Sequence, residues 1–171
     1  MIAGQGTRLA TLEASRYYLI NTLVNIGAAV VVTSPILSAR LALPLKLVEW
    51  PGTWMFIAYA VFIGYGVLGT LAWSAIYYLS GTVLGVGSLR RRAVIIHLAL
   101  HNLAAYGIGL LMGYSVGYVG GSARLEGYGV AVITSLISWA VIPIGVLVFI
   151  GLLSSILGVA IIIDGWGKTQ K

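Results

Sequence analysis

The sequence predicts an all-α, polytopic membrane protein that folds as a bundle of four transmembrane helices. Of its 171 residues, 60% are hydrophobic and only 8% are charged, whereas a soluble domain carries roughly 25% charged residues. The apolar residues gather in four runs, each at least as long as the roughly 20 residues that cross a bilayer. Four strands of such length cannot close a barrel, so each run must satisfy its backbone hydrogen bonds as a helix.

The four predicted spans leave no room for a separate soluble region, so residues 1–171 form a single membrane domain. Their approximate bounds are Tyr17 to Ala39, Gly52 to Leu79, Ala93 to Val119 and Gly129 to Ile163. Pro35 lies near the end of the first span. The fourth is too long for one perpendicular helix and too short for two spans, so we expect it to tilt or to protrude. Pro143 in its middle lacks a backbone donor and predicts a kink.

Two further patterns are typical of helices packed in a bilayer. Gly109, Gly113 and Gly117 repeat every four residues in the third span, and such a stripe of small residues predicts a seam where another helix approaches closely. Aromatic residues near the predicted span ends indicate an interfacial belt; they are Trp50, Trp54, Trp166, Tyr17, Tyr18 and Tyr128. The connection from Leu41 to Trp50 is expected to lie along the same interface.

The basic residues predict how the chain is oriented. With four spans, the N-terminal tail, the second connection and the C-terminal tail share one side of the membrane, and they hold Arg8, Arg16, Arg90, Arg91, Arg92, Lys168 and Lys171. The opposite side holds Arg40, Lys46 and Arg124. The positive-inside rule therefore places both termini in the cytoplasm, with the protein integral to the cell membrane. The polar start of the chain does not resemble a cleavable signal peptide. Because the charges lie in short connections and not on one basic face, nucleic acid is not an expected partner.

The two histidines of the chain, His97 and His101, lie four residues apart in the third span and share a helical face. Three interpretations are open. One histidine ligates heme iron, within the bundle or across a homodimer; the pair holds a metal ion; or both are structural and bind backbone, tyrosine or Asn102. The chain has no cysteine and no third histidine, which disfavours a metal centre. The structural interpretation is favoured.

The remaining polar residues give little support to independent catalysis. The acids Glu13, Glu49, Glu126 and Asp164 all fall at predicted span ends or in connections. No span therefore contains the carboxylate that an ion-coupled transporter or an acid–base enzyme commonly uses, and we assign no catalytic residue. Arg90, Arg91 and Arg92 are expected to anchor the chain at the membrane surface, and contact with an anionic lipid or a propionate group is the alternative.

From Gly69 onward the order of features resembles the last helices of the catalytic subunits of heme–copper oxidases, in the branch of C-type oxidases and nitric-oxide reductases. The matching pieces are GTLAWSAIYYLSG at Gly69 to Gly81, a basic turn at Ser88 to Arg92, HNLAAYGIGLLMGYSVGYVGG at His101 to Gly121, and a final long helix. The resemblance covers a little over half the chain and matches His101 to a histidine that does not ligate iron. The preceding WMFIAYAVFIGYG has Tyr59 and Val61 where the family would place a histidine-x-histidine pair.

The resemblance implies a small membrane subunit or accessory protein of a respiratory, heme-containing complex of the electron-transport chain. Without the metal ligands it implies no oxygen or nitric-oxide reduction by this chain alone. His97, His101 and Tyr106 are the expected contacts with heme or quinone, and other membrane subunits or further copies of the chain are the expected partners. The alternative is an oligomeric transporter or channel module for a neutral or hydrophobic solute, which the glycine stripe and the absence of buried acids would permit. A membrane enzyme acting on a lipid is less favoured.

Overall fold

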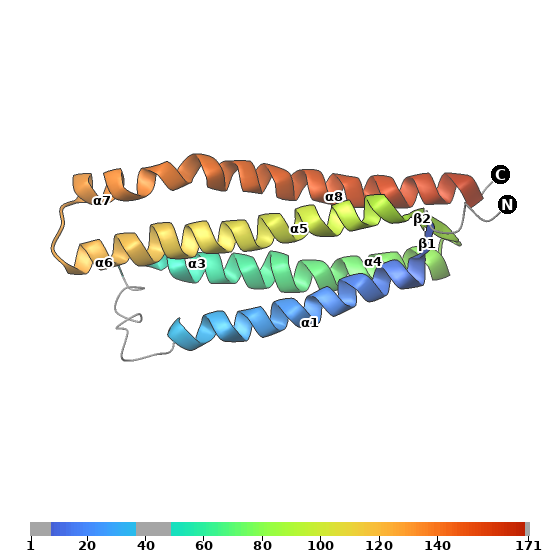
Figure 1. Ribbon diagram of the computed structural model, residues 1–171, viewed down its shortest axis with the longest axis horizontal. Coiled ribbons are helices and arrows are strands. Elements are labelled where there is room, and N and C mark those ends of the chain that lie inside the picture. Colours follow the sequence, from blue (N-terminus) through green and yellow to red (C-terminus); the bar gives the residue numbers. More distant parts are fainter. Residues whose placement is uncertain (1–7, 37–48, 170–171) are drawn as a thin grey trace.

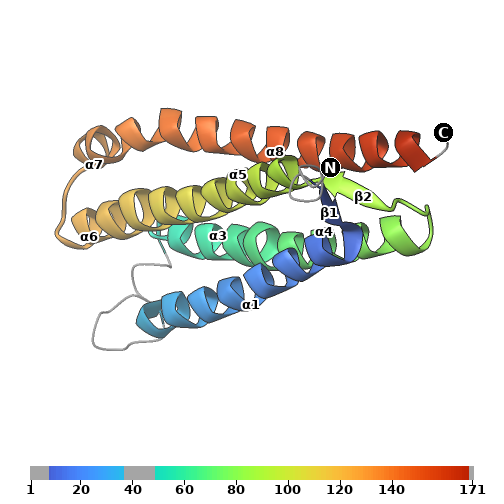
Figure 2. The ribbon, with the colours of Figure 1, turned by 45° about the vertical axis from the view of Figure 1, so that its right-hand side comes forward.

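Four long helical segments run side by side in the computed structural model, which describes residues 8–36 and 49–169 (Figures 1 and 2). The first is α1 (Thr11–Ile36). The second joins α3 (Thr53–Val61), the π-helix η3 (Phe62–Leu68) and α4 (Gly69–Thr82). The third joins α5 (Arg91–Leu110), the π-helix η4 (Leu111–Val119) and α6 (Gly120–Leu125). The fourth joins α7 (Val130–Ile137), the 3₁₀ turn η5 (Ser138–Ala140) and α8 (Val141–Thr169).

The second and third segments form the centre of the bundle. The helix α1 packs along α4, α8 packs along α5, and α3 lies against η4. Figure 1 shows α1 and α8 at opposite edges with the other two segments between them. The predicted all-α fold of four helices is therefore confirmed. Three of the helices, at Thr53–Thr82, Arg91–Leu125 and Val130–Thr169, are long and apolar enough to cross a membrane.

The observed helices extend beyond the predicted spans by up to six residues at one end. The excess arises because hydropathy marks only the apolar part of a helix, whereas the backbone hydrogen bonds continue into polar residues at its ends. The C-terminal end of the first predicted span, at Ala39, and the predicted interfacial connection up to residue 48 lie outside the described residues.

The fourth segment is interrupted by the 3₁₀ turn η5, close to where Pro143 predicts a kink. Pro143 is the third residue of α8, so its ring stands in the first turn, where a backbone N–H has no intrahelical partner in any case. A regular helix through this point would place the proline ring against the carbonyl of Trp139, which lies within η5. The interruption thus relieves the conflict, and it precedes the proline by one turn.

A two-stranded antiparallel ribbon joins the beginning of the chain to its middle, a feature that the sequence did not predict. Strand β1 (Arg8–Ala10) pairs with β2 (Ser88–Arg90), and Leu9 stands opposite Leu89. Both leucines are buried, in a cluster that also contains Val86 and Ile161. The ribbon ties the start of α1 to the start of α5 at the end of the bundle where α8 also finishes (Figure 1).

The glycine stripe of the third segment is the packing seam that its spacing predicts. A Cβ built on Gly109 would lie 3.7 Å from Phe62, one on Gly113 would lie 3.2 Å from Ala58, and one on Gly117 would lie 2.5 Å from Met55. The two backbones therefore come progressively closer toward the α6 end. This approach of α3 to η4 requires residues without side chains.

The distribution of polar side chains is the reverse of that in a water-soluble bundle. The interior contains fully or almost fully buried polar residues, which are Thr11, Ser15, Thr22, Asn25, Thr70, Ser74, Ser80, His97, His101 and Ser154. The outer surface carries many exposed large apolar side chains, for example Leu23, Val30, Leu110 and Ile142. Large exposed apolar surfaces mark contact with lipid or another protein, and their extent around the whole bundle indicates lipid.

Candidate functional site

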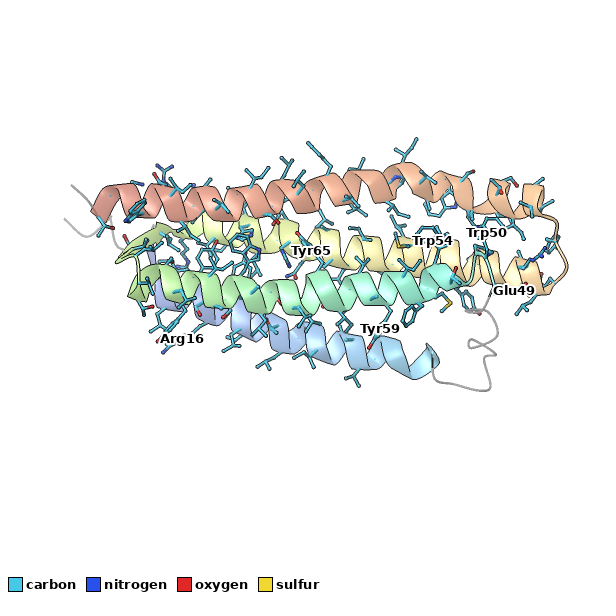
Figure 3. All side chains as sticks on the ribbon, turned by 180° about the vertical axis from the view of Figure 1, so that it is seen from behind. Arg16, Glu49, Trp50, Trp54, Tyr59 and Tyr65 are labelled. Atoms are coloured by element: carbon cyan, nitrogen blue, oxygen red, sulfur yellow. The ribbon has the colours of Figure 1, made fainter. Side chains whose placement is uncertain are left out.

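The candidate site is a cluster of imidazole and phenol groups in the interior between α1, α4 and α5. His97 and His101 both point into it from α5, as their spacing predicts, and neither is exposed (0%). Their ring centroids lie 6.4 Å apart with the planes almost perpendicular. Figure 3 shows Tyr65 lying between the helices in this interior region.

His97 is held by groups from all the other helical segments. Its Nδ1 lies 2.8 Å from the hydroxyl of Tyr77, and its ring lies against those of Tyr18 and Trp73 at centroid distances of 5.2 and 4.5 Å. On the α8 side, a Cβ built on Gly158 would lie 2.5 Å from Cε1 of His97. Only glycine at that position allows α8 to cover the imidazole so closely.

His101 is held by the π-helix η3. Its Nε2 lies 2.9 Å from the carbonyl oxygen of Tyr65, and the two rings are stacked at 4.1 Å. Because a carbonyl oxygen only accepts hydrogen bonds, Nε2 must carry the proton, and Nδ1 of the neutral ring is then an acceptor. The stack and the hydrogen bond come from the same residue, so η3 fixes both the orientation and the tautomer of this imidazole.

The π-helix matters because its carbonyl groups accept side-chain donors. Besides the bond from His101 to Tyr65, the carbonyl of Gly66 accepts from Asn25 Nδ2 at 2.6 Å and from Thr70 Oγ1 at 2.7 Å. A π-helical turn changes the backbone hydrogen-bond pattern within a longer α-helix, and such turns are common at functional sites. Here it directs two neighbouring carbonyls to partners on α5 and α1.

A second polar layer connects α1 to the centre of the bundle. Asn21 and Asn102 exchange two side-chain hydrogen bonds, of 2.9 and 2.8 Å, and Tyr106 donates to Asn25 Oδ1 at 2.8 Å. Asn102, one of the proposed partners of the histidines, is thus bound to α1 instead. Tyr106 does not join the histidine cluster directly, because its hydroxyl belongs to this second layer.

Three polar atoms of the cluster have no hydrogen-bond partner among the described residues: Tyr18 Oη, His97 Nε2 and His101 Nδ1. An unsatisfied buried polar atom costs about 1–3 kcal/mol, and native proteins contain few of them. Because all three atoms belong to one cluster, this is the part of the described interior where side-chain polar atoms can still accept or donate a hydrogen bond. Sequence reasoning found the two histidines but missed Tyr18, which it assigned to the interfacial belt although the residue is fully buried.

The cluster suits hydrogen bonding better than metal coordination. The described part of the chain contains no group of three or more histidine, cysteine or acidic side chains that could hold a metal ion. The two nitrogen atoms with capacity to ligate heme iron are His97 Nε2 and His101 Nδ1. Since helices enclose both rings, an iron atom would reach either one only if the helices separated.

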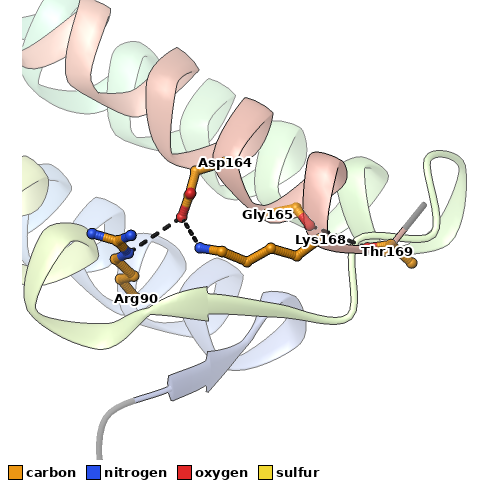
Figure 4. Close-up of polar contacts among 5 residues, drawn as sticks. All are labelled: Arg90, Asp164, Gly165, Lys168 and Thr169. Atoms are coloured by element: carbon orange, nitrogen blue, oxygen red, sulfur yellow. Dashed lines mark hydrogen bonds and ion pairs between the residues drawn. The ribbon is translucent and has the colours of Figure 1, made fainter. Parts of the chain in front are cut away.

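The predicted lipid or anion contacts lie together at the ribbon end. Arg90 Nε lies 3.3 Å from Asp164 Oδ2, and the same carboxylate oxygen accepts a hydrogen bond from Lys168 (Figure 4). Arg91 and Arg92 open α5 and are exposed. Arg90 is therefore engaged within the chain, whereas its two neighbours face outward.

Comparisons with family models, with curated proteins and with solved structures found no match for this chain. The fold and the site define a class: an α-helical bundle with three segments able to cross a membrane and a buried imidazole–phenol cluster.

Proposed function

We propose that this protein is a small integral membrane subunit or accessory protein of a heme-containing, oxidase-like respiratory complex. The observation that carries the proposal is the buried cluster of His97, His101, Tyr18 and Tyr77 in a bundle whose outer surface is apolar. Polar groups inside a membrane are costly, and they commonly mark pathways or binding sites. Imidazole and phenol groups can exchange protons without a carboxylate, as redox-linked membrane complexes require.

The segments that resemble the oxidase helices also pack together. They supply most of α4, most of the third segment and most of the fourth segment, and Trp73 and Gly158 from two of them meet around His97 of α5. This compact arrangement supports a unit that docks as a whole. Because Tyr59 and Val61 stand where the family has metal ligands, the proposed role is packing and contact with heme or quinone. In the proposed complex, partner chains carry out the reduction of oxygen.

The proposal includes a fourth span, formed by α1. Its outward residues are apolar, with Ile20, Leu23 and Val30 between 58% and 65% exposed, while Thr22 and Asn25 are buried against the centre. Such a helix exposes to its surroundings only groups suited to hydrocarbon. Four spans also agree with the position of β1 and of the end of α8 at one end of the bundle, which the basic residues assign to the cytoplasm.

The transporter alternative receives no comparable support. It relied on the glycine stripe and on the absence of buried acids, and the stripe is covered by Met55, Ala58 and Phe62 of the second segment. A stripe used for helix packing within one chain does not line a pore between chains.

The heme part is tested by mild solubilisation of native membranes, capture of the tagged protein, and a reduced-minus-oxidised spectrum with mass analysis of the partners. We expect an α-band and at least one heme-binding chain to co-purify. A matched capture of the His97→Phe/His101→Leu double variant shows whether association requires the two imidazoles. A spectrum without heme bands, together with the absence of any heme protein from the captured material, would refute the proposal.

The four-span part is tested separately with single cysteines, since the chain has none of its own. Leu84→Cys and Gly167→Cys are expected to react with an impermeant maleimide only when the cytoplasmic face is open. Glu126→Cys should react from the opposite face. Ala10→Cys, just before α1, should react from the cytoplasmic face, as Leu84→Cys and Gly167→Cys do. Trp50→Cys should react from the opposite face, as Glu126→Cys does. If Ala10→Cys and Trp50→Cys react from the same side, α1 is not a span.

A further inference from the structure

The ribbon end of the bundle concentrates exposed basic side chains from three different helices. Arg16 lies on α1, Arg91 and Arg92 on α5, and Lys168 on α8, and all are at the end where β1 pairs with β2. Figure 3 shows Arg16 projecting outward from the bundle near this end. These four residues, with Arg90, are called the basic collar below.

The acids near the collar neutralise only part of its charge. Asp164 is shared by Arg90 and Lys168, and Glu13 Oε2 lies 3.3 Å from the backbone nitrogen of Ala10. No ion pair forms between the described acids and Arg16, Arg91 or Arg92. Three guanidinium groups therefore remain without an acidic partner in this part of the chain.

The opposite end of the bundle has a different charge balance. Its described charged residues are Arg124, Glu49 and Glu126, and Arg124 Nε lies 3.7 Å from Glu49. That end therefore carries no excess of positive charge among the residues that the structure describes. The described residues of the two ends thus differ in charge balance.

We infer that the basic collar binds the headgroups of anionic phospholipids, whose phosphate charge no headgroup cation neutralises, and that Arg91, Arg92 and Arg16 supply the selectivity. The guanidinium group binds phosphate through paired, charge-assisted hydrogen bonds. The collar begins where the apolar helices end, which is the depth at which lipid phosphates lie. Arg90 takes less part, because Asp164 already holds it. This inference does not depend on the heme proposal, since it concerns lipid and not the protein partner.

The test measures which lipids remain bound to the purified protein. The protein is exchanged into mixed micelles that contain equal amounts of phosphatidylglycerol and phosphatidylcholine, repurified, and its lipids are quantified by mass spectrometry. We expect phosphatidylglycerol to be enriched, and the enrichment to be about thirtyfold lower in the Arg91→Gln/Arg92→Gln variant, since each basic residue near an anionic surface adds roughly one kcal/mol and about 1.4 kcal/mol is a factor of ten. Arg16→Gln should lose a smaller share.

Two matched variants make the result specific. Arg124→Gln removes a guanidinium at the opposite end and should retain the full enrichment. Arg91→Lys/Arg92→Lys keeps the charge and should retain most of it, which also shows that the fold tolerates substitution there. Equal enrichment in the glutamine double variant and the parent would overturn the inference. So would suppression of the enrichment by millimolar inorganic phosphate, because the site would then bind free phosphate and not a headgroup.

Discussion

The hydroxyl of Tyr77 lies 2.8 Å from Nδ1 of His97, and neither side chain is exposed. This contact joins α4 to α5 in the middle of the imidazole–phenol cluster. It is one of only two hydrogen bonds that the histidine rings make within the described residues, the other being that of His101 to Tyr65. Removing either hydrogen bond should therefore produce a measurable change in the free energy of unfolding.

Replacing Tyr77 with phenylalanine is expected to destabilise the bundle by about 1–3 kcal/mol, because it leaves both ring nitrogens of His97 without a partner. Unfolding by increasing mole fractions of sodium dodecyl sulfate, followed by circular dichroism, measures the change. Tyr78→Phe is the matched control, because Tyr78 follows Tyr77 in the sequence but its side chain is exposed. This variant should leave the stability unchanged. Equal stability of the two variants would show that the bond to His97 contributes nothing.

Gly158→Ala is expected to cost about 1–3 kcal/mol through overpacking. Its new Cβ would lie 2.5 Å from Cε1 of His97 and equally close to Cη2 of Trp73, both of them parts of enclosed rings. Gly145→Ala in the same helix meets nothing within 4 Å and should be neutral or slightly stabilising, because alanine favours the helix. Thermal unfolding of both variants in one detergent gives the comparison. A tolerated Gly158→Ala would mean that α8 does not cover His97 so closely.

The glycine stripe predicts a graded response to alanine. Gly109→Ala should be close to neutral, Gly113→Ala mildly destabilising, and Gly117→Ala the most destabilising, because its Cβ would approach the backbone nitrogen of Met55 to 2.5 Å. A backbone atom cannot move aside as a flexible side chain can. The midpoints of thermal unfolding should follow this order. Any other ranking would contradict the observed convergence of α3 and η4.

The reciprocal pair of Asn21 and Asn102 should show energetic coupling. Side-chain hydrogen bonds between membrane helices average roughly 0.6 kcal/mol and reach about 1.7 kcal/mol. Because this pair makes two bonds, we expect a coupling energy near the upper value in a double-mutant cycle of Asn21→Ala and Asn102→Ala. Strictly additive effects would show that α1 is held to α5 by other contacts. Thr82→Ala, whose hydroxyl is exposed, provides a control for loss of a helix-surface side chain.

Hydropathy and spacing predicted the helices because the bilayer imposes a strong and simple constraint on apolar length. The same reasoning predicted that His97 and His101 share a buried face and that the glycine stripe packs against a helix. The π-helix η3 was not predictable, since its unusual hydrogen bonds are compensated by Asn25 and His101, which lie far away in sequence. A ribbon of three residues per strand is likewise too short to leave a periodic signal.

The sequence does contain one signal for the second polar layer. Asn21 and Asn25 lie four residues apart in the first apolar run, with Thr22 beside them. Amides on one face of a membrane helix require partners, so they already indicated that α1 turns this face inward. The identity of the partners, Asn102 and Tyr106, depends on the rotation of α5 about its axis, which spacing within one helix does not determine.

The short ribbon has a consequence for biogenesis. Strand β1 is synthesised about eighty residues before its partner β2, and the second helical segment is made in between. Asn25 Nδ2 can therefore meet its acceptor on Gly66 once the second segment has been made, but Asn21 and Asn25 Oδ1 lack Asn102 and Tyr106 until the third segment follows. The docking of α1 against the bundle is therefore completed only after the third segment has been synthesised.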